Sequence, residues 1–130
     1  MSEVTERTSG GSLNAAITNE TVRILTAYTG RGAERARTVV GANVVTVILE
    51  KCLTKAELAL AHAGRAEQVR NLRHQFQEVM RDDLVGAVER LTGRKVIGFL
   101  SDQQIEPDVS SEVFVLNGPV DGSTAEATTD

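Results

Sequence analysis

A glycine-rich segment, Thr29–Ala33, is the first place where the residue types suggest ligand chemistry. Loops that bind phosphate follow a strand and open a helix, so that free helix amides point at the anion. This segment instead follows a predicted helix and precedes predicted strands, which is typical of a helix end with Gly30 at positive φ. The alternative is an anion site built on Arg31 with Arg35 and Arg37, because guanidinium groups form paired hydrogen bonds with carboxylate, bicarbonate or phosphate.

The nucleophilic and metal-binding residue types are few and scattered. His62 and His74 are twelve residues apart on different predicted helices, and the single cysteine, Cys52, is remote in sequence from both. Their spacing matches no zinc or other transition-metal motif. Because no histidine stands at a diagnostic spacing, Cys52 is predicted to be an inert, half-buried thiol, and one cysteine cannot form an internal disulfide.

The densest acidic segment holds Asp102, Glu106 and Asp108. Carboxylates on a loop are the ligands that hard cations prefer, but this spacing is not that of a calcium loop, and Pro107 is equally typical of an ordinary connector. No carboxylate pair and no Ser, His and Asp set can be assembled from the chain. The sequence therefore predicts a protein that is not an enzyme and has no cofactor and no metal.

The charge of the 130-residue chain is concentrated at its ends. The net charge is −4, of which residues 1–12 contribute −1 and residues 117–130 contribute −3, so the body between them is neutral. A neutral body argues against nucleic-acid binding, which needs a basic surface. No apolar run reaches the roughly 20 residues of a membrane span, and no signal peptide is visible. We expect a cytoplasmic protein with a disordered leader (1–12), one domain (13–116) and a disordered acidic tail (117–130).

Hydrophobic periodicity and turn residues predict the order helix, two strands, two helices, two strands. A capping box at Thr54 and Glu57 marks one helix start, and the continuous apolar run Val44–Leu49 indicates a central strand. Each pair of consecutive strands is predicted to form a hairpin, and helices separate the two hairpins along the chain. This order favours an α+β fold with a four-stranded, mostly antiparallel sheet covered by helices. The predicted helices are 13–28, 55–62 and 66–91, and the predicted strands are 36–40, 44–50, 95–101 and 109–116.

The helix predicted over 66–91 is unusually long. At about 40 Å it exceeds the width of a compact domain of about 100 residues. We therefore expect part of its apolar stripe to contact a second copy in a homo-oligomer. Asp83 falls near the apolar face, where burial of an unpaired carboxylate costs free energy. We therefore expect Asp83 to mark the point where the apolar stripe leaves the core and meets the partner. The predicted interface residues are Phe76, Val79, Met80 and Asp83.

A weak repeat relates the two halves of the chain at an offset of 63 residues. The tripeptide Thr-Gly-Arg at 29–31 recurs at 92–94, and each copy follows a predicted helix and precedes two predicted strands. If the two hairpins meet the helix ends in a common region, Arg31, Arg35 and Arg94 form the predicted anion site.

A family resemblance rests on motifs in both halves. The segment 91–102, Leu-Thr-Gly-Arg-Lys-Val-Ile-Gly-Phe-Leu-Ser-Asp, resembles the C-terminal signature of the MpsC-like family, as do Asp-Val at 108–109 and Glu-Val-Phe-Val-Leu at 112–116. The N-terminal half is similar through Gly-Arg-Gly at 30–32, Val-Val at 39–40 and Leu-Thr at 53–54 with Glu57 and Leu60. The resemblance covers residues 14–116.

This resemblance implies a small soluble protein linked to a sodium-translocating, membrane-potential-generating system and to inorganic-carbon uptake, and it supplies no catalytic residue. We therefore expect a cytoplasmic accessory or regulatory subunit that docks on an integral-membrane transport subunit, peripheral to the inner membrane and not inserted into it. The alternative is a homo-oligomeric regulator, unrelated to transport, that senses a small anion or a nucleotide at the predicted arginine site.

Overall fold

The computed structural model describes residues 10–120, which form three helices and one four-stranded sheet. The sheet order is β1-β2-β4-β3, and every neighbouring pair of strands is antiparallel. The predicted α+β fold and its element order are confirmed. The helices are α2 (Gly10–Thr29), α3 (Lys55–His62) and α4 (Ala66–Thr92), and the strands are β1 (Arg35–Gly41), β2 (Val44–Glu50), β3 (Val96–Gln104) and β4 (Val109–Leu116).

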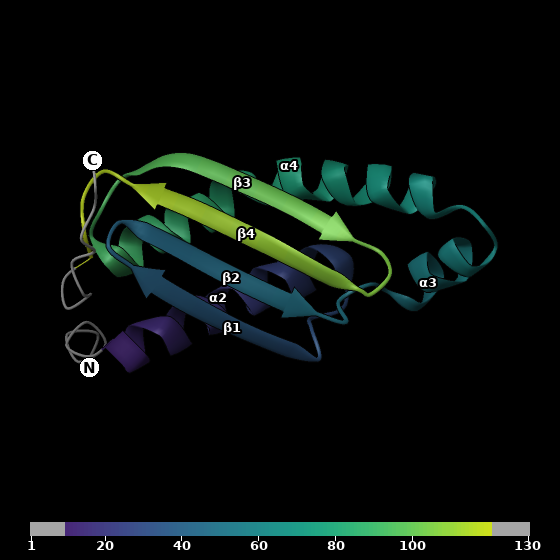
Figure 1. The fold of residues 1–130 in the computed structure, drawn as a ribbon, viewed down its shortest axis with the longest axis horizontal. Helices are drawn as coiled ribbons and strands as arrows, with labels where there is room; N and C mark the ends of the chain where they lie inside the picture. Colours follow the sequence, from purple (N-terminus) through teal and green to yellow (C-terminus); the bar gives the residue numbers. More distant parts are fainter. Residues whose placement is uncertain (1–9, 121–130) are drawn as a thin grey trace.

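The two long helices lie on one face of the sheet, behind it in Figure 1. α2 packs against β1, α4 packs against β3, and the two helices contact each other. Side chains alternate across each strand, so the core takes every second residue. Val45, Val47 and Leu49 of β2 face the helices and are at most 1% exposed, as are Phe114 and Leu116 of β4. No helix of the described chain covers the opposite face of the sheet (Figure 1).

Both long helices end as their sequences predict. Gly30 (φ 85°) follows α2 and Gly93 (φ 72°) follows α4, both in the left-handed region where glycine avoids the strain of a Cβ atom. The capping box at the start of α3 is also present, because the Thr54 hydroxyl accepts from the Glu57 amide while the Glu57 carboxylate accepts from the Thr54 amide.

The first turns of α4 extend past the sheet and pack against α3 (Figure 1). Leu53, Val69 and Ile105 form a second, small hydrophobic core at this end, with side chains of α3 packed around it. α3 covers the part of α4 that the sheet does not reach. The length of α4 therefore does not by itself require a partner chain.

Most predicted element boundaries lie within one residue of the observed ones, and three larger differences concern α2, β3 and Val120. α2 begins at Gly10, within the segment expected to be a disordered leader. β3 continues to Gln104, through residues expected to belong to a polar loop, because pairing with β4 supplies their backbone hydrogen bonds. Val120 lies in the expected tail, yet it is 4% exposed and its amide donates to Ala42. The rest of the predicted leader and tail lies outside the described residues.

Candidate functional site

The structure does not bring the three arginines of the predicted anion site together. Arg31 precedes β1 and Arg94 precedes β3, and these strands run in opposite directions, so the two residues lie at opposite ends of the sheet. A seven-residue strand separates such ends by about 23 Å. Arg35 is exposed at the start of β1, at the Arg31 end.

Arg31 and Arg94 each hold a nearby backbone carbonyl. The Arg31 Nη2 atom donates to the carbonyl oxygen of Lys51 at 2.6 Å, and the Arg94 Nε atom donates to that of Pro119 at 2.8 Å. Each arginine therefore ties a helix end to a segment that is distant in sequence.

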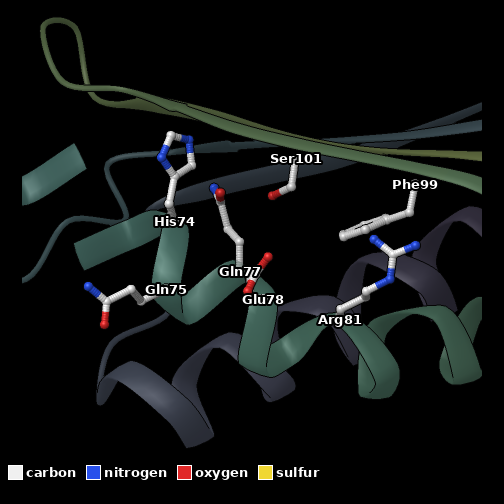
Figure 2. A pocket seen from close by; sticks show the side chains of 7 residues that line it. All are labelled: His74, Gln75, Gln77, Glu78, Arg81, Phe99 and Ser101. Carbon is white, nitrogen blue, oxygen red and sulfur yellow. The ribbon is translucent and has the colours of Figure 1, made fainter. Parts of the chain in front are cut away.

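A pocket of about 490 Å³ opens instead between α4 and the outer strand β3. Figure 2 shows side chains from the helix and from the strand converging on it. Its lining residues are His74, Gln75, Gln77, Glu78, Arg81, Phe99 and Ser101.

Two polar side chains, Gln77 and Ser101, form the inner wall of this pocket. Gln77 is only 7% exposed, and its side chain rises from α4 toward the sheet in Figure 2. The Ser101 hydroxyl is buried beside the Glu112 carboxyl and has no hydrogen bond of ordinary geometry among residues 10–120. Buried polar groups are almost always paired with protein, water or ligand. The inner wall of the pocket therefore offers donors and acceptors.

The mouth of the pocket combines a cation with an aromatic ring. The Arg81 guanidinium lies over the Phe99 ring, 5.3 Å from its centroid, and forms no ion pair within the described part of the chain. The His74 Nε2 atom is 3.8 Å from Asp102 Oδ1. The pocket can thus contact an anionic or planar group at its mouth while the inner amide and hydroxyl bind polar atoms.

A buried carboxyl group lies on the strand beside the pocket. Glu112 of β4 pairs directly with Ser101 in the sheet register and is 3% exposed, and its Oε1 atom lacks a hydrogen-bond partner among the described residues. Burial raises the pKa of Glu112 to about 7, although the nearby Ser101 hydroxyl and the charge of Arg73 act in the opposite direction. The carboxyl group therefore titrates near neutral pH.

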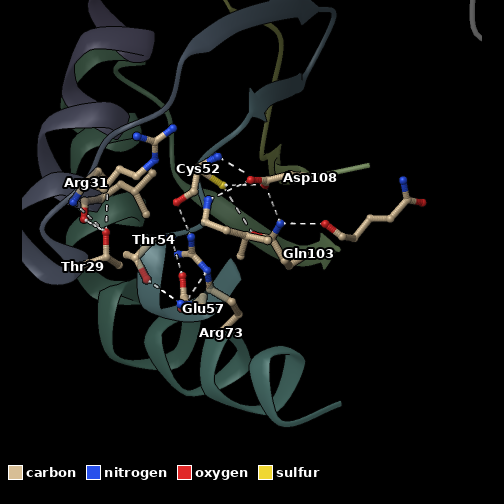
Figure 3. A network of polar contacts seen from close by, with 11 residues as sticks. Thr29, Arg31, Cys52, Thr54, Glu57, Arg73, Gln103 and Asp108 are labelled. Atoms are coloured by element: carbon tan, nitrogen blue, oxygen red, sulfur yellow. Dashed lines mark hydrogen bonds and ion pairs between the residues drawn. The ribbon is translucent and has the colours of Figure 1, made fainter. Parts of the chain in front are cut away.

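A polar network holds the loop between β2 and α3 against α4 (Figure 3). Arg73, 3% exposed, forms an ion pair with Glu57 at 3.3 Å and donates to the Cys52 carbonyl at 2.5 Å. Asp108, at the end of the β3–β4 loop, accepts from the amides of Cys52 and Leu53. These contacts are structural, because most of them end on backbone atoms of the loop.

Cys52 and two carboxylates of the predicted acidic loop lie in different surroundings. Cys52 is 1% exposed, so it is fully rather than half buried, and burial raises the pKa of its thiol to about 11. Asp102 lies on β3, while Asp108 binds the β2–α3 loop, so these two carboxylates serve different neighbours. Among residues 10–120, no group of three or more His, Cys, Asp or Glu side chains could hold a metal ion.

The residues predicted to form an oligomer interface do not share one surface. Met80 is 2% exposed within the core, and Phe76 packs against that core. Val79 is 60% exposed. Asp83 accepts a hydrogen bond from the Tyr28 hydroxyl at 2.8 Å, so its carboxylate links α4 to α2.

The pocket was absent from the sequence-based expectations, although one signal pointed to it. Gln77 and Arg73 stand at buried positions of the stripe that continues along α4 as Met80 and Leu84. Polar residues at apolar-stripe spacing indicate a polar site inside the fold. Ser101 and Phe99 carried no such signal, because only the strand register brings them to the helix.

The comparison with known families gives one match. Residues 9–118 match the family described as "Na+-translocating membrane potential-generating system (MpsC)". The match includes every described strand and helix. No curated protein and no solved structure matches the chain. Within residues 10–120, no helix has the length and apolar character needed to cross a membrane.

Proposed function

The chain belongs to the MpsC family, and we propose that it is a soluble accessory or regulatory component of a Na+-translocating, membrane-potential-generating system, with no catalysis of its own. The observation that carries this proposal is the extent of the family match, which covers the complete described fold rather than one motif. In this proposal the protein is cytoplasmic and reaches the membrane through an integral-membrane transport subunit.

The roles of the reactive side chains support a non-catalytic function. Cys52 is buried, and a thiol with a pKa of about 11 forms little thiolate at neutral pH. Arg73, Glu57 and Asp108 are engaged in contacts that hold the β2–α3 loop. These groups therefore serve the stability of the fold, which suits a binding or regulatory subunit.

The test measures membrane potential in cells that lack the chain. Deletion should lower the Na+-dependent component of the potential, read with a potential-sensitive dye, and expression of the full chain should restore it. The full chain should also co-purify with an integral-membrane Na+-transport subunit from detergent-solubilised membranes. An unchanged Na+-dependent potential after deletion would contradict the proposal, because an accessory subunit must affect its system.

A second candidate function, the sensing of a small polar ligand, is favoured by the pocket between α4 and β3. We propose that the ligand contacts Arg81 at the mouth and the Gln77 amide and the buried Ser101 hydroxyl inside. This proposal moves the sensing site away from Arg31 and Arg94, which already bind backbone carbonyls.

Thermal denaturation with bicarbonate, phosphate and a nucleotide as separate probes tests this second function. A probe at about 100 times its Kd should stabilise the fold by about 2.7 kcal/mol. Arg81→Ala and Gln77→Ala should abolish the shift, whereas Arg31→Ala and Arg94→Ala should retain it. A shift lost only in the Arg31 or Arg94 variant would place the ligand at the helix ends instead. No shift with any probe would count against ligand sensing.

A further inference from the structure

The face of the sheet opposite the helices carries an apolar surface, here called the open face. We propose that a second copy of this chain covers the open face in a symmetric dimer. Val39 of β1 is 57% exposed and Leu100 of β3 is 66% exposed, on the two outer strands. A contiguous apolar patch of this kind typically marks an interaction surface. The apolar residues of the open face are Val39, Val44, Ile48, Leu100, Val109, Val113 and Val115.

The register shows that these side chains share one face. Val47 of β2 is fully buried toward the helices, so its neighbour Ile48 faces the other way. Directly paired residues of adjacent strands point to the same side. The pairs place Arg37 beside Ile48 on β1 and β2, and Asp102 beside Ser111 on β3 and β4. One row across the open face therefore begins at Arg37 and ends at Asp102.

The two ends of this row carry opposite, accessible charges. The Arg37 side chain is 61% exposed and forms one ion pair, with Glu50 at 3.3 Å. The Asp102 side chain is 80% exposed at the outer edge of the sheet, where its Oδ1 atom accepts from the Gln103 amide and lies 3.8 Å from the His74 Nε2 atom of α4, so the dimer contact uses its Oδ2 atom. An arginine has five N–H donors, so Arg37 can bind a second carboxylate while it keeps Glu50. The two opposite charges lie on the outer strands, separated by β2 and β4.

This charge arrangement selects one symmetry for the dimer. A two-fold axis parallel to the strands places β1 of one copy over β3 of the other, so each Arg37 faces the second copy's Asp102 and the apolar ends meet. An axis perpendicular to the strands would place Arg37 over Val39 and Asp102 over Leu100 of the second copy. Burying charges against apolar groups is costly, so the parallel axis is favoured.

The size of the open face predicts a weak dimer. Four strands spaced by about 4.8 Å, each with seven residues of about 3.4 Å, present about 450 Å² per copy. The total of about 900 Å² lies at the low end of specific interfaces. The dimer should therefore form reversibly as the protein concentration rises, with the two sheets packed about 10 Å apart.

Charge reversal tests the contact between copies directly. In sedimentation velocity runs on the full chain, Arg37→Asp and Asp102→Arg should each raise the dimer dissociation constant at least about tenfold, because each creates two like-charge contacts. An equimolar mixture of the two variants should dimerise again, since the carboxylate introduced at position 37 of one copy then faces the guanidinium introduced at position 102 of the other. Leu100→Asp should abolish dimers, because it places a charge in the apolar contact.

Arg23→Asp is the matched control. Arg23 is 65% exposed on α2, on the other side of the sheet, and this substitution changes the net charge by the same amount as Arg37→Asp. It should leave the dissociation constant unchanged, and far-UV circular dichroism and melting curves should show that all variants fold.

Three outcomes would overturn the proposal. The first is a wild-type chain that stays monomeric up to about 500 μM, a concentration at which even millimolar affinity gives detectable dimer. The second is a mixture of the two charge variants that remains monomeric. The third is protection of the Leu100→Cys variant from maleimide at concentrations where the chain is monomeric, because a terminal segment of the same chain would then occupy the open face.

Discussion

The two halves of this protein, α2–β1–β2 and α4–β3–β4, have the same order of elements but differ in their side chains where the helix meets its outer strand. At the 63-residue offset, the core-facing positions of the helices coincide: Ile17 with Met80 and Leu25 with Val88 are all buried. The Thr-Gly-Arg tripeptides at 29–31 and 92–94 end both helices with the same contacts. Each threonine hydroxyl accepts from the arginine amide, and each glycine has positive φ.

The halves differ where the helix meets its outer strand. In the first half, the Thr18 and Thr38 hydroxyls are 2.7 Å apart and close the space between α2 and β1. The residues at the same offset in the second half are Arg81 and Ser101, which form no such bond and line the pocket instead. One side-chain pair thus decides whether this place in the fold is sealed or open.

Among residues 10–120, the buried charged side chains all lie in the second half or in the connection that leads into it. At the 63-residue offset, Glu112 of β4 corresponds to Leu49 of β2, so a buried carboxyl group in the second half stands where the first half has a buried apolar side chain. The Arg73–Glu57 ion pair joins α4 to α3 and has no counterpart between α2 and a neighbouring helix among residues 10–120 that is similarly buried. The second half and the connection before it therefore hold the buried groups that can respond to pH or to a ligand.

Removal of the buried arginine should give the largest effect. Arg73→Met leaves the Glu57 carboxylate buried without its cation, and we expect a loss of about 3–5 kcal/mol in the free energy of unfolding, measured with urea. The double variant Glu57→Gln with Arg73→Met should lose less than Arg73→Met alone, because no charge is then left unpaired. Equal losses in both variants would show that the ion pair is not the source of the effect.

Glu112 should make stability depend on pH. Its pKa is about 7 in the fold and 4.5 ordinarily, so between these values the folded state holds a proton that the unfolded state has released. Stability therefore falls as pH rises through this window. Glu112→Gln should gain about 3 kcal/mol over wild type at high pH, and little at low pH. Urea denaturation at pH 4 and pH 8 measures both, and parallel pH profiles would contradict the assignment.

The helix-ending glycines should have equal effects in the two halves. Gly30→Ala and Gly93→Ala should each cost about 1–2 kcal/mol, because a Cβ atom strains the left-handed conformation. Gly86→Ala is the control: Gly86 lies inside α4, where an added Cβ atom meets open space, and alanine there should stabilise the helix by about 0.5–1 kcal/mol. A large difference between the first two variants would break the likeness of the halves.

The smallest expected effects are those of two hydroxyl substitutions, one where α2 meets β1 and one in the pocket between α4 and β3. Thr38→Val removes the partner of the Thr18 hydroxyl and should cost about 1 kcal/mol. Ser101→Ala removes a hydroxyl that lies beside the Glu112 carboxyl but forms no hydrogen bond of ordinary geometry among residues 10–120, so thermal denaturation should show a change below about 0.5 kcal/mol or a slight gain. A cost for Ser101→Ala as large as that for Thr38→Val would indicate that the pocket hydroxyl is already bound.

The sequence alone determined the features that depend on near neighbours. The cap at Thr54, the helix ends at Gly30 and Gly93 and the alternation along β4 follow from a few adjacent residues, and the structure confirms them. The end of β3 was missed because the polar residues of that strand look like a loop until pairing with β4 satisfies their amides.

Only the tertiary structure decided which distant residues meet. The strand order separates Arg31 from Arg94, although both belong to the same tripeptide, and the register places Ser101 beside Glu112 and opposite Gln77 of α4. The physical reason is that local patterns report which face of an element is apolar, while a site depends on contacts between elements. Strand order and register set those contacts here, and they depend on how the whole core packs.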